Sequence, residues 1–426
     1  MKQNIALALY YNQPNRNSFN ALIGAIGTDA RFKDLDIFFL DNEKELISKI
    51  SGIENTHEKT IIAISFLTTQ LWETKKLISR LKKKLNTRPL YIAGGPHPTG
   101  DPKGTLSLGF DIAIIGEGEE TFIELLKNID SGSDYTTMKG IAYADNEGTH
   151  HINAKRPPID LDRYPSFAAR HNRFGPIEIT RGCPFACYFC ETPRIFGSTI
   201  RHRSIENICT HARTMIDCNR YDIRLISPNA FSYGSKDGRK LNIKKLKDLL
   251  KRIKDTIKPK GRLYIGSFPS EVRPEHVTEE TIALVKKYAD NDNIIIGAES
   301  GSQKLLDLCH RGHTVEDIYR AVDLTTKAGL KANVDFIFGL PEESVEDIKD
   351  TIKVMNDLIS KGAKIHAHAF IPLPLTPFAK REASGIKKDT EKMLHKLLPK
   401  GVIYGNWKEQ ENISKKISIY LKTGRL

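Results

Sequence analysis

Three of the six cysteines in this 426-residue chain, Cys183, Cys187 and Cys190, fall within eight positions. They directly follow an alternating segment, residues 175–180 (GPIEIT), that is typical of a strand, so we expect them on a loop at a strand end. Three thiolates so close together can bind three corners of a metal cluster, and without a fourth cysteine nearby one metal keeps an open coordination position. An open position favours chemistry over a purely structural role.

Structural zinc and disulfide bonding both fit these cysteines less well. Structural zinc normally takes four protein ligands, commonly from two C-x2-C pairs, whereas the spacing here is C-x3-C-x2-C. A disulfide framework is typical of small secreted domains with an even set of cysteines. We expect the remaining cysteines, Cys209, Cys218 and Cys309, to be ordinary small side chains rather than a second cluster.

The segment Arg181–Gly197 (RGCPFACYFCETPRIFG), with Phe189 directly before the third cysteine, resembles the signature of the radical S-adenosylmethionine (SAM) superfamily, and in particular its cobalamin-binding branch. The resemblance implies that Cys183, Cys187 and Cys190 bind a 4Fe–4S cluster whose free iron is chelated by the amino and carboxylate groups of SAM. In that superfamily the reduced cluster cleaves SAM to methionine and a 5′-deoxyadenosyl radical, which takes a hydrogen atom from the substrate. Thiolate ligation and an open iron suit such a cluster.

The first 130 residues alternate short apolar runs with helical patterns. This rhythm predicts an α/β domain with a parallel, doubly wound sheet, and such sheets bind ligands beyond the carboxyl ends of their strands. Several of the turns there contain glycine or small polar residues that let a ligand approach the backbone, although plain turn chemistry explains any one of them. The predicted strands are residues 5–10, 35–40, 60–66, 90–94 and 111–115.

These turns resemble the cobalamin-binding domain that precedes the radical SAM core in this branch, through the phrases GGPHPT (94–99) and GEGEETF (116–122). The family's D-x-H-x-x-G motif, whose histidine binds cobalt, is absent, because Gly95 stands where the aspartate belongs. Many members hold cobalamin without a protein histidine on the metal, so the resemblance still implies this cofactor. The residues that it places on the cobalamin side are Ser65, Gly94, Gly95, His97 and Glu117.

Three further segments complete the predicted organisation. Residues 131–172 are expected to be a linker with a hairpin near 140–153, because its prolines favour extended chain over helix. From 173 to 385 the alternation of strands and helices resumes in about six units, which predicts a partial (β/α)6 radical SAM barrel. Residues 386–426 form a short basic extension, with a helical pattern from 387 to 398 and irregular chain from 401 to 407.

The resemblance also assigns positions at the strand ends of the barrel to SAM. Asn229, after the second strand, is a candidate for the SAM amino group, and Arg273, after the third, matches an arginine common in this branch. Glu299 and Ser300 stand in a phrase whose Glu and Ser reach the ribose hydroxyls, and a carboxylate is a suitable acceptor for a diol. Arg311 would neutralise the SAM carboxylate.

After the fifth strand the chain resembles the adenine-contacting pattern G-x-I-x-G-x-x-E. It matches at Ile337, Gly339 and Glu342, with Asp335 in place of the first glycine. A barrel presents the loops at the carboxyl ends of its strands on one rim. We therefore expect these residues to meet Phe189 and the cysteines there.

The chain is basic, with 65 Lys and Arg against 52 Asp and Glu, a net charge of +13. Basic clusters at 82–84, at 244–260 and in the last forty residues could attract a phosphate-bearing partner, or they could be solvated helix faces. The sequence has no run of eighteen apolar residues, and the apolar run 5–9 is too short for a signal peptide. We therefore expect a cytoplasmic protein with no membrane partner.

The resemblance makes methyl transfer from cobalamin to an unactivated carbon or phosphorus of a small-molecule or phosphate-bearing substrate the most concrete hypothesis. An electron donor such as flavodoxin or ferredoxin is an expected partner. One alternative is a cobalamin-assisted or cobalamin-independent radical rearrangement or cyclisation. Another is a non-catalytic iron–sulfur redox sensor or nucleic-acid-binding protein. Because the tail shows no RNA-binding barrel and the N-terminal domain no second cysteine trio, we do not expect RNA methylthiolation or a nucleic-acid partner.

Overall fold

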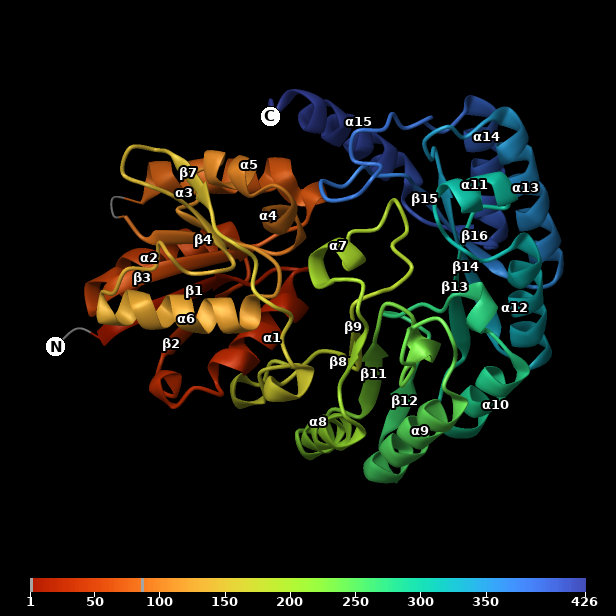
Figure 1. Ribbon diagram of the computed structural model, residues 1–426, viewed down its shortest axis with the longest axis horizontal. Coiled ribbons are helices and arrows are strands. Elements are labelled where there is room, and N and C mark those ends of the chain that lie inside the picture. The colour runs from red at the N-terminus through yellow and green to blue at the C-terminus, as the bar shows by residue number, and fades with distance from the viewer. Residues whose placement is uncertain (1–2, 86–87) are drawn as a thin grey trace. The chain divides into compact units, whose positions relative to one another are not determined.

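The computed structural model describes residues 3–85 and 88–426, and its chain folds into two compact units (Figure 1). The first unit extends to Gly175 and includes Leu426, and the second is Pro176–Arg425. Each sheet lies within one of the two units. The predicted fold class, a doubly wound sheet followed by a radical SAM barrel, is confirmed.

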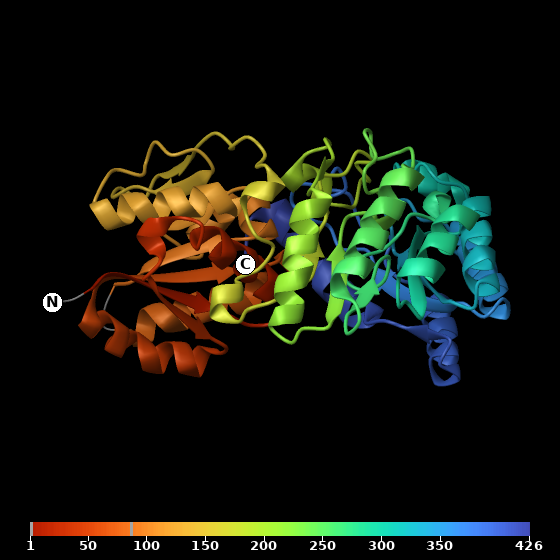
Figure 2. The same ribbon diagram turned by 90° about the horizontal axis from the view of Figure 1, so that it is seen from below.

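The first unit is built on a seven-stranded sheet with the order β2-β1-β3-β4-β5-β6-β7, in which β1 to β5 are parallel. Helices lie on both of its faces (Figure 2): α1 packs against α6 on one face, and α2 packs against α3 on the other. The parallel strands are β1 (Gln3–Tyr10), β2 (Asp36–Leu40), β3 (His57–Ser65), β4 (Leu90–Gly94) and β5 (Ile112–Ile114). The helices are α1 (Arg16–Ile26), α2 (Glu43–Thr56), α3 (Leu71–Lys84), α4 (Pro96–Gly100), α5 (Pro102–Ser107) and α6 (Gly118–Ser131).

All five strands predicted for this unit are present. Their apolar side chains, such as Leu7, Ile61 and Ile112, are fully buried because helices cover both faces of a parallel sheet. The predicted hairpin is β6 (Ile141–Ala144) and β7 (His150–Ile152), and it continues the sheet antiparallel to β5.

The second unit contains two parallel sheets that together form the wall of a partial barrel. The first has the order β12-β11-β8 and the second the order β13-β14-β15-β16. They are joined where Val272 bridges to Ile296 and where the Ile295 N–H donates to the Gly266 carbonyl at 2.9 Å. The strands are β8 (Ile177–Glu178), β11 (Asp222–Ile226), β12 (Arg262–Tyr264), β13 (Asn293–Glu299), β14 (Lys331–Phe338), β15 (Lys364–Ala369) and β16 (Ile403–Tyr404).

Helices follow the barrel strands in chain order. On β14 and β15 the side chains alternate between a buried apolar set, which includes Phe336 and Ala367, and a polar set on the opposite face. The polar set includes Asp335, His366 and His368, which line a cavity. The helices are α7 (Thr192–Phe196), α8 (Ile205–Asp217), α9 (Ile243–Ile257), α10 (Glu279–Tyr288), α11 (Gln303–Leu308), α12 (Val315–Lys327), α13 (Val345–Ser360), α14 (Lys388–Leu397) and α15 (Trp407–Thr423).

The C-terminal extension differs from the irregular chain predicted for residues 401–407. Residues 403–404 form β16, which pairs parallel with β15, and α15 packs against β15. The strand is too short to give an alternating pattern, and Trp407, Ile417 and Tyr420 are spread among charged residues. The extension is therefore part of the barrel unit.

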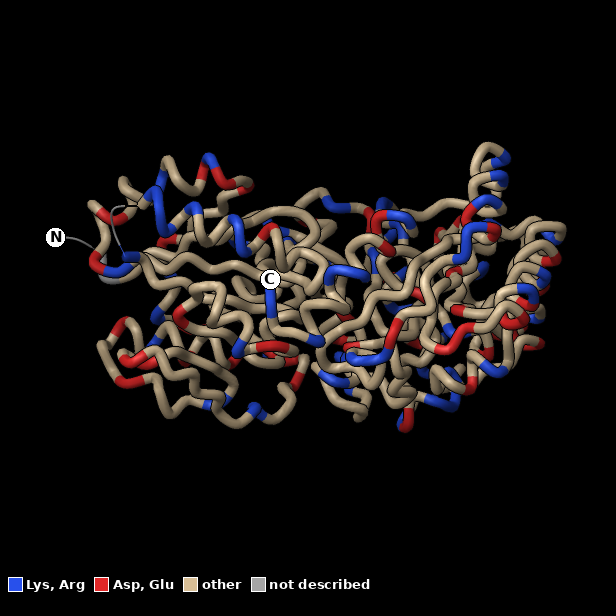
Figure 3. The backbone as a smooth tube through the Cα atoms, turned by 90° about the horizontal axis from the view of Figure 1, so that it is seen from above, with Lys and Arg blue, Asp and Glu red and all other residues tan. Residues whose placement is uncertain are grey.

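Lysine and arginine are dispersed along the backbone among aspartate and glutamate (Figure 3). On α9, Arg252 pairs with Glu206 at 2.5 Å and Lys254 with Asp290 at 2.6 Å. The leucines of the same helix are fully buried. These contacts favour the solvated-face interpretation of the 244–260 cluster. Within residues 3–85 and 88–426, no helix is both long and apolar enough to cross a membrane.

Substitution of Gly405 tests whether the C-terminal extension packs closely against β15. The φ of Gly405 is +135°, and an added Cβ would lie 2.1 Å from the Ala367 carbonyl oxygen. We expect Gly405→Ala to lower the free energy of unfolding by about 2–3 kcal/mol through steric strain. The control Gly401→Ala, where an added Cβ meets nothing within 4 Å, should cost about 1 kcal/mol from its positive φ alone. Urea unfolding followed by Trp407 fluorescence in a Trp72→Phe background measures both, and equal midpoints would contradict the packing.

Candidate active site

The three clustered cysteines lie on a loop that follows the short strand β9 (Thr180–Arg181) and precedes α7. Gly182 has a φ of +88°, and an added Cβ would lie 2.2 Å from the Thr199 carbonyl oxygen, so this close approach requires glycine. The Cys183 N–H donates to the Gly197 carbonyl at 3.1 Å. All three cysteines line one cavity of about 540 Å³ inside the barrel unit.

Two guanidinium groups lie beside the sulfur of Cys187. Arg311 Nη1 is 3.5 Å and Arg273 Nη1 is 4.0 Å from Cys187 Sγ, so both cations lie within reach of this sulfur. Burial raises the pKa of Cys183, and it raises the pKa of Cys190 to about 12, so burial favours the protonated thiols, and metal binding would displace those protons. Three sulfurs facing one cavity, with cations beside one of them, fit a thiolate-bound iron–sulfur cluster.

Arg311 is held in place by two further contacts. Its Nη2 donates to the Gly297 carbonyl at 2.6 Å and lies 3.1 Å from Glu299 Oε1, with both side chains less than a tenth exposed. Burial raises the pKa of Glu299, and the adjacent Arg311 guanidinium opposes this effect by favouring the ionised carboxylate. Glu299 also has a φ of +69°, which is strained for a residue other than glycine.

Glu271 lines the cavity together with Glu178 and Asp335, whereas Glu299 is not among its lining residues. Glu299 was predicted to bind the ribose of SAM, but its carboxylate pairs with Arg311. Burial raises the pKa of Glu271 as well. No pattern in the sequence singled out Glu271, which stands two residues before Arg273 in a loop. The ribose contact of Glu299 stays a prediction.

Ser300 and Asn229 support the loops around the cavity. Ser300 accepts the Ser302 N–H at 3.1 Å and lies 3.2 Å from Thr351 Oγ1. Asn229 accepts the Arg273 N–H at 3.3 Å, and its Nδ2 lies 2.6 Å from His276 Nδ1. Both side chains are buried, so their contact with SAM also stays a prediction.

The predicted adenine loop is present, but its two glutamates differ in position. The Gly339 N–H donates to Glu343 Oε2 at 2.7 Å. Glu342 has a φ of +64°, and its side chain is 56% exposed and pairs with Arg381 at 2.9 Å. The turn thus directs Glu343 into the loop and Glu342 to the surface. The sequence motif alone does not show which of the two glutamates points inward.

Phe189 lines the cavity, as predicted for a residue beside the cysteines, and its ring centre lies 6.0 Å from the guanidinium carbon of Arg311. It packs against a small apolar cluster that includes Leu340 and Phe370. The aromatic ring therefore forms an apolar wall next to the thiolates.

Three further residues of the cavity were not predicted to act together. In the register of β14 and β15, Asp335 stands opposite His366. His366 Nδ1 is 3.0 Å from Asp335 Oδ1 and 3.0 Å from His368 Nε2. Burial lowers the pKa of His368 to about 4, so this imidazole is neutral at pH 7. The letters H-A-H in a strand were a usable signal, because alternate residues share a face.

Of the residues predicted to line the cobalamin side, Ser65 lines a cavity of the first unit, whereas His97 and Glu117 are buried. Ser65 lines a cavity of about 310 Å³ near the carboxyl ends of β1 and β3. Gly94 ends β4, and Gly95 precedes α4. His97 is fully buried, with Nδ1 3.1 Å from Thr68 Oγ1, and burial lowers its pKa to about 4.

Glu117 is also buried, and its Oε2 accepts the Ile159 N–H at 3.0 Å. Among the described residues, Ser65 thus faces a cavity where an open α/β sheet binds ligands, and Glu117 holds a neighbouring segment in place. A small polar side chain at the carboxyl end of β3 fits a hydrogen bond to an amide of cobalamin. The cobalamin contacts of Gly94, Gly95, His97 and Glu117 stay predictions.

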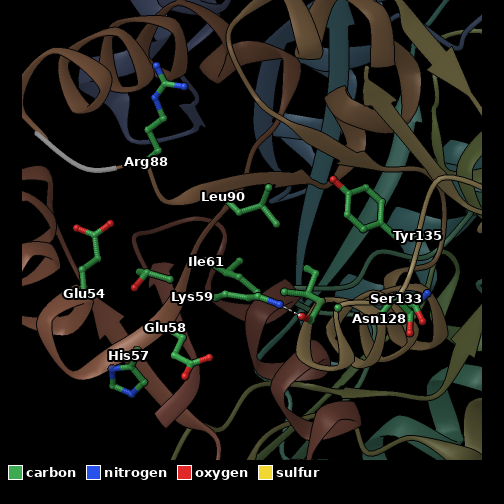
Figure 4. Close-up of a pocket in the computed structure, with 13 residues that line it drawn as sticks. Glu54, His57, Glu58, Lys59, Ile61, Arg88, Leu90, Asn128, Ser133 and Tyr135 are labelled. Atoms are coloured by element: carbon green, nitrogen blue, oxygen red, sulfur yellow. Dashed lines mark hydrogen bonds between the residues drawn. The ribbon is translucent and has the colours of Figure 1, made fainter. Parts of the chain in front are cut away.

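A second hollow of the first unit, of about 520 Å³, lies at the opposite edge of the sheet (Figure 4). It is lined by the first residues of β3 and β4, including Lys59 and Leu90, and Lys59 Nζ donates to the Ile129 carbonyl at 2.5 Å. Because open α/β sheets bind ligands at the carboxyl ends of their strands, this hollow is not the candidate cofactor site.

The iron content of variants tests whether the three clustered cysteines bind the cluster and the other cysteines do not. We expect Cys187→Ala to lose most of the iron and sulfide that the reconstituted full chain retains, because one of three thiolate ligands is gone. Cys309 is buried beside the site, and Cys309→Ala is the matched control that should retain the wild-type content. Equal iron loss in both variants, measured per chain after anaerobic desalting, would contradict the assignment.

Two family models match the chain, the Radical SAM superfamily over residues 177–355 and the B12 binding domain over residues 23–126. Among solved structures, the radical SAM methyltransferase TsrM from Kitasatospora setae, with cobalamin and a 4Fe–4S cluster bound, superposes with a TM-score of 0.68. At 16% identity it covers 89% of this chain and 74% of its own, and this likeness shows the shared fold.

Two curated relatives come from archaea. An uncharacterized protein of Methanocaldococcus jannaschii is 30% identical over 386 residues, covering 78% of this chain and 73% of the relative. An uncharacterized methyltransferase of Pyrococcus horikoshii is 28% identical over 344 residues, covering 76% of this chain and 70% of the relative. The predicted cofactors, a 4Fe–4S cluster, SAM and cobalamin, are confirmed at the level of the family. The chain belongs to the radical SAM superfamily of enzymes, in the branch that carries a B12-binding domain.

Proposed function

We propose that this enzyme transfers a methyl group from cobalamin to an unactivated carbon or phosphorus of a small-molecule substrate. The observation that carries the proposal is the cysteine-lined cavity with Arg273 and Arg311 beside Cys187, in a chain that also has a B12-binding domain. The methyltransferase relative and the TsrM structure support it. When bound, the cluster and SAM supply the electron transfer and the radical, and cobalamin supplies the methyl group.

The role of the protein is to fix charges before the substrate arrives. Arg311 contacts Cys187 Sγ, the Gly297 carbonyl and Glu299, and the donors of its planar guanidinium point in fixed directions that suit all three contacts at once. Arg273 lies over the Phe185 ring at 3.5 Å and donates to the Arg311 carbonyl. Both cations are therefore held beside the thiolates without the reorganisation that water would require.

The charges of the cavity bear on the class of substrate. Arg181 pairs with Glu178 at 2.7 Å, and Arg311 pairs with Glu299 at 3.1 Å. A phosphate-bearing substrate would have to compete with these carboxylates for the guanidinium groups. We therefore propose a small-molecule substrate that need not carry a phosphate group. As the protein partner we propose an electron donor such as flavodoxin or ferredoxin.

The test is anaerobic and uses the full chain with a reconstituted cluster, cobalamin, a strong reductant and SAM labelled in its methyl group. We expect S-adenosylhomocysteine and 5′-deoxyadenosine to form, with the label recovered on cobalamin. Arg311→Lys should slow deoxyadenosine formation about a hundredfold, because lysine keeps the charge but loses the planar fork. The control Arg320→Lys, on an exposed ion pair of α12, should leave the rate unchanged.

Deoxyadenosine without any label on cobalamin would contradict methyl transfer and favour a rearrangement or cyclisation. A chain with a full cluster that cleaves no SAM and binds nucleic acid in a salt-sensitive way would favour the sensor hypothesis.

A further inference from the structure

Two neighbouring strands place three metal-binding side chains together on the wall of the barrel cavity. Asp335 on β14 stands opposite His366 on β15 in the strand register. His368 is two residues further along β15, so it points to the same side as His366. All three residues line the cavity that also contains Cys187 and Arg311.

The donors and acceptors of this trio do not match one another for hydrogen bonding alone. His366 Nδ1 lies 3.0 Å from Asp335 Oδ1 and 3.0 Å from His368 Nε2, and the three ligand atoms lie within 4.8 Å of one another. An imidazole nitrogen carries either one proton or one lone pair, so a single Nδ1 cannot serve both neighbours well. A cation that accepts three lone pairs satisfies all of them.

The same distances suit a metal ion. At metal–ligand bonds of about 2.1 Å, two ligands at right angles around the metal are about 3.0 Å apart. Two histidines and one carboxylate on one side of a metal, with open positions on the other, form a common site for divalent transition metals. The side chains of Asp335 and His366 are 12% and 29% exposed, so the trio is sheltered yet open to the cavity.

The C-terminal extension supplies the groups that orient the trio. The Tyr404 ring stacks on the His366 ring at 4.4 Å with an angle of 9°. Gln410 Oε1 accepts the Ala369 N–H at 2.9 Å, and its Nε2 lies 3.3 Å from His368 Nδ1. Metal-binding histidines are commonly oriented through their second nitrogen, although they usually donate it to an acceptor, whereas Gln410 presents its NH2 group.

We propose that Asp335, His366 and His368 bind one divalent transition-metal ion, of the zinc or iron class, through the carboxylate and the two imidazoles. Its open positions face the cavity and bind an oxygen or nitrogen donor of the substrate. The binding of substrate to the metal rests on the proposed function, because it requires that substrate and SAM meet in this cavity. The substrate class is then a small molecule with a metal-binding donor group.

Gln410 offers a gain-of-function test. A histidine bound to metal through Nε2 carries its proton on Nδ1 and needs an acceptor there. Gln410 now presents its NH2 to that nitrogen, because its oxygen is held by Ala369. In Gln410→Glu, one carboxylate oxygen accepts the Ala369 N–H and the other accepts the His368 proton. We expect this variant to bind metal about tenfold more tightly.

The closing experiment titrates the full chain with Co²⁺ in a Cys183→Ser/Cys187→Ser/Cys190→Ser background, so that thiolates do not compete. We expect one equivalent to bind, with the weak visible absorption of nitrogen and oxygen ligation and no thiolate charge-transfer band. Asp335→Ala and His368→Ala should each weaken binding about a hundredfold. His395→Ala, an exposed histidine 3.6 Å from Glu391, is the matched control and should change nothing.

Acetohydroxamate, a chelator with two oxygen donors, should shift the Co²⁺ spectrum if open positions face the cavity. An unchanged spectrum would overturn the substrate-donor role. To guard against misfolding, urea unfolding midpoints are compared across the variants, and the titration is repeated in wild type with its cluster loaded. If neither protein binds Co²⁺, or if binding survives both Asp335→Ala and His368→Ala, the trio is a metal-free hydrogen-bonded cluster and the proposal is wrong. The titrations contain no SAM or cobalamin, so either result leaves methyl transfer to be judged by its own assay.

Discussion

The contact of Arg311 with Cys187 and Glu299 is the constraint on which the site depends. One guanidinium joins the sulfur of the cysteine loop, the carbonyl of Gly297 on β13 and a buried carboxylate. Both members of the ion pair are less than a tenth exposed, and removal of one partner of such a pair costs about 3–5 kcal/mol. The strain at Glu299 is tolerated because this network fixes its backbone. The ion pair, the backbone conformation of Glu299 and the position of Cys187 thus depend on one another through Arg311.

The same barrel wall gives the cavity two chemically different sides. The segments that follow β9, β12 and β13 bring sulfur and guanidinium groups, whereas β14 and β15 bring a carboxylate and two imidazoles. The alternation of side chains on these strands allows this, because Val334, Phe336 and Ala367 are buried on the opposite face while the polar residues face the cavity. The C-terminal extension completes the second side through Tyr404 and Gln410.

Patterns with a strong local signal could be predicted from the sequence, and contacts across the fold could not. The cysteine spacing located the loop, and continuous apolar runs located the parallel strands of the first unit. The choice between Glu342 and Glu343 depends on a backbone turn, and the pairing of Glu299 with Arg311 depends on neighbours distant in sequence. The strand β16 has only two residues and gives no pattern at all.

The central claim is that the cluster held by Cys183, Cys187 and Cys190 has an iron open to SAM. Electron paramagnetic resonance of the reduced, reconstituted full chain tests it most directly, with spectra recorded before and after addition of SAM. We expect the signal of one reduced 4Fe–4S cluster per chain, with g values that change when SAM binds the open iron. A signal that SAM leaves unchanged, in protein with a full complement of iron, would mean that the fourth iron is closed and would contradict the claim.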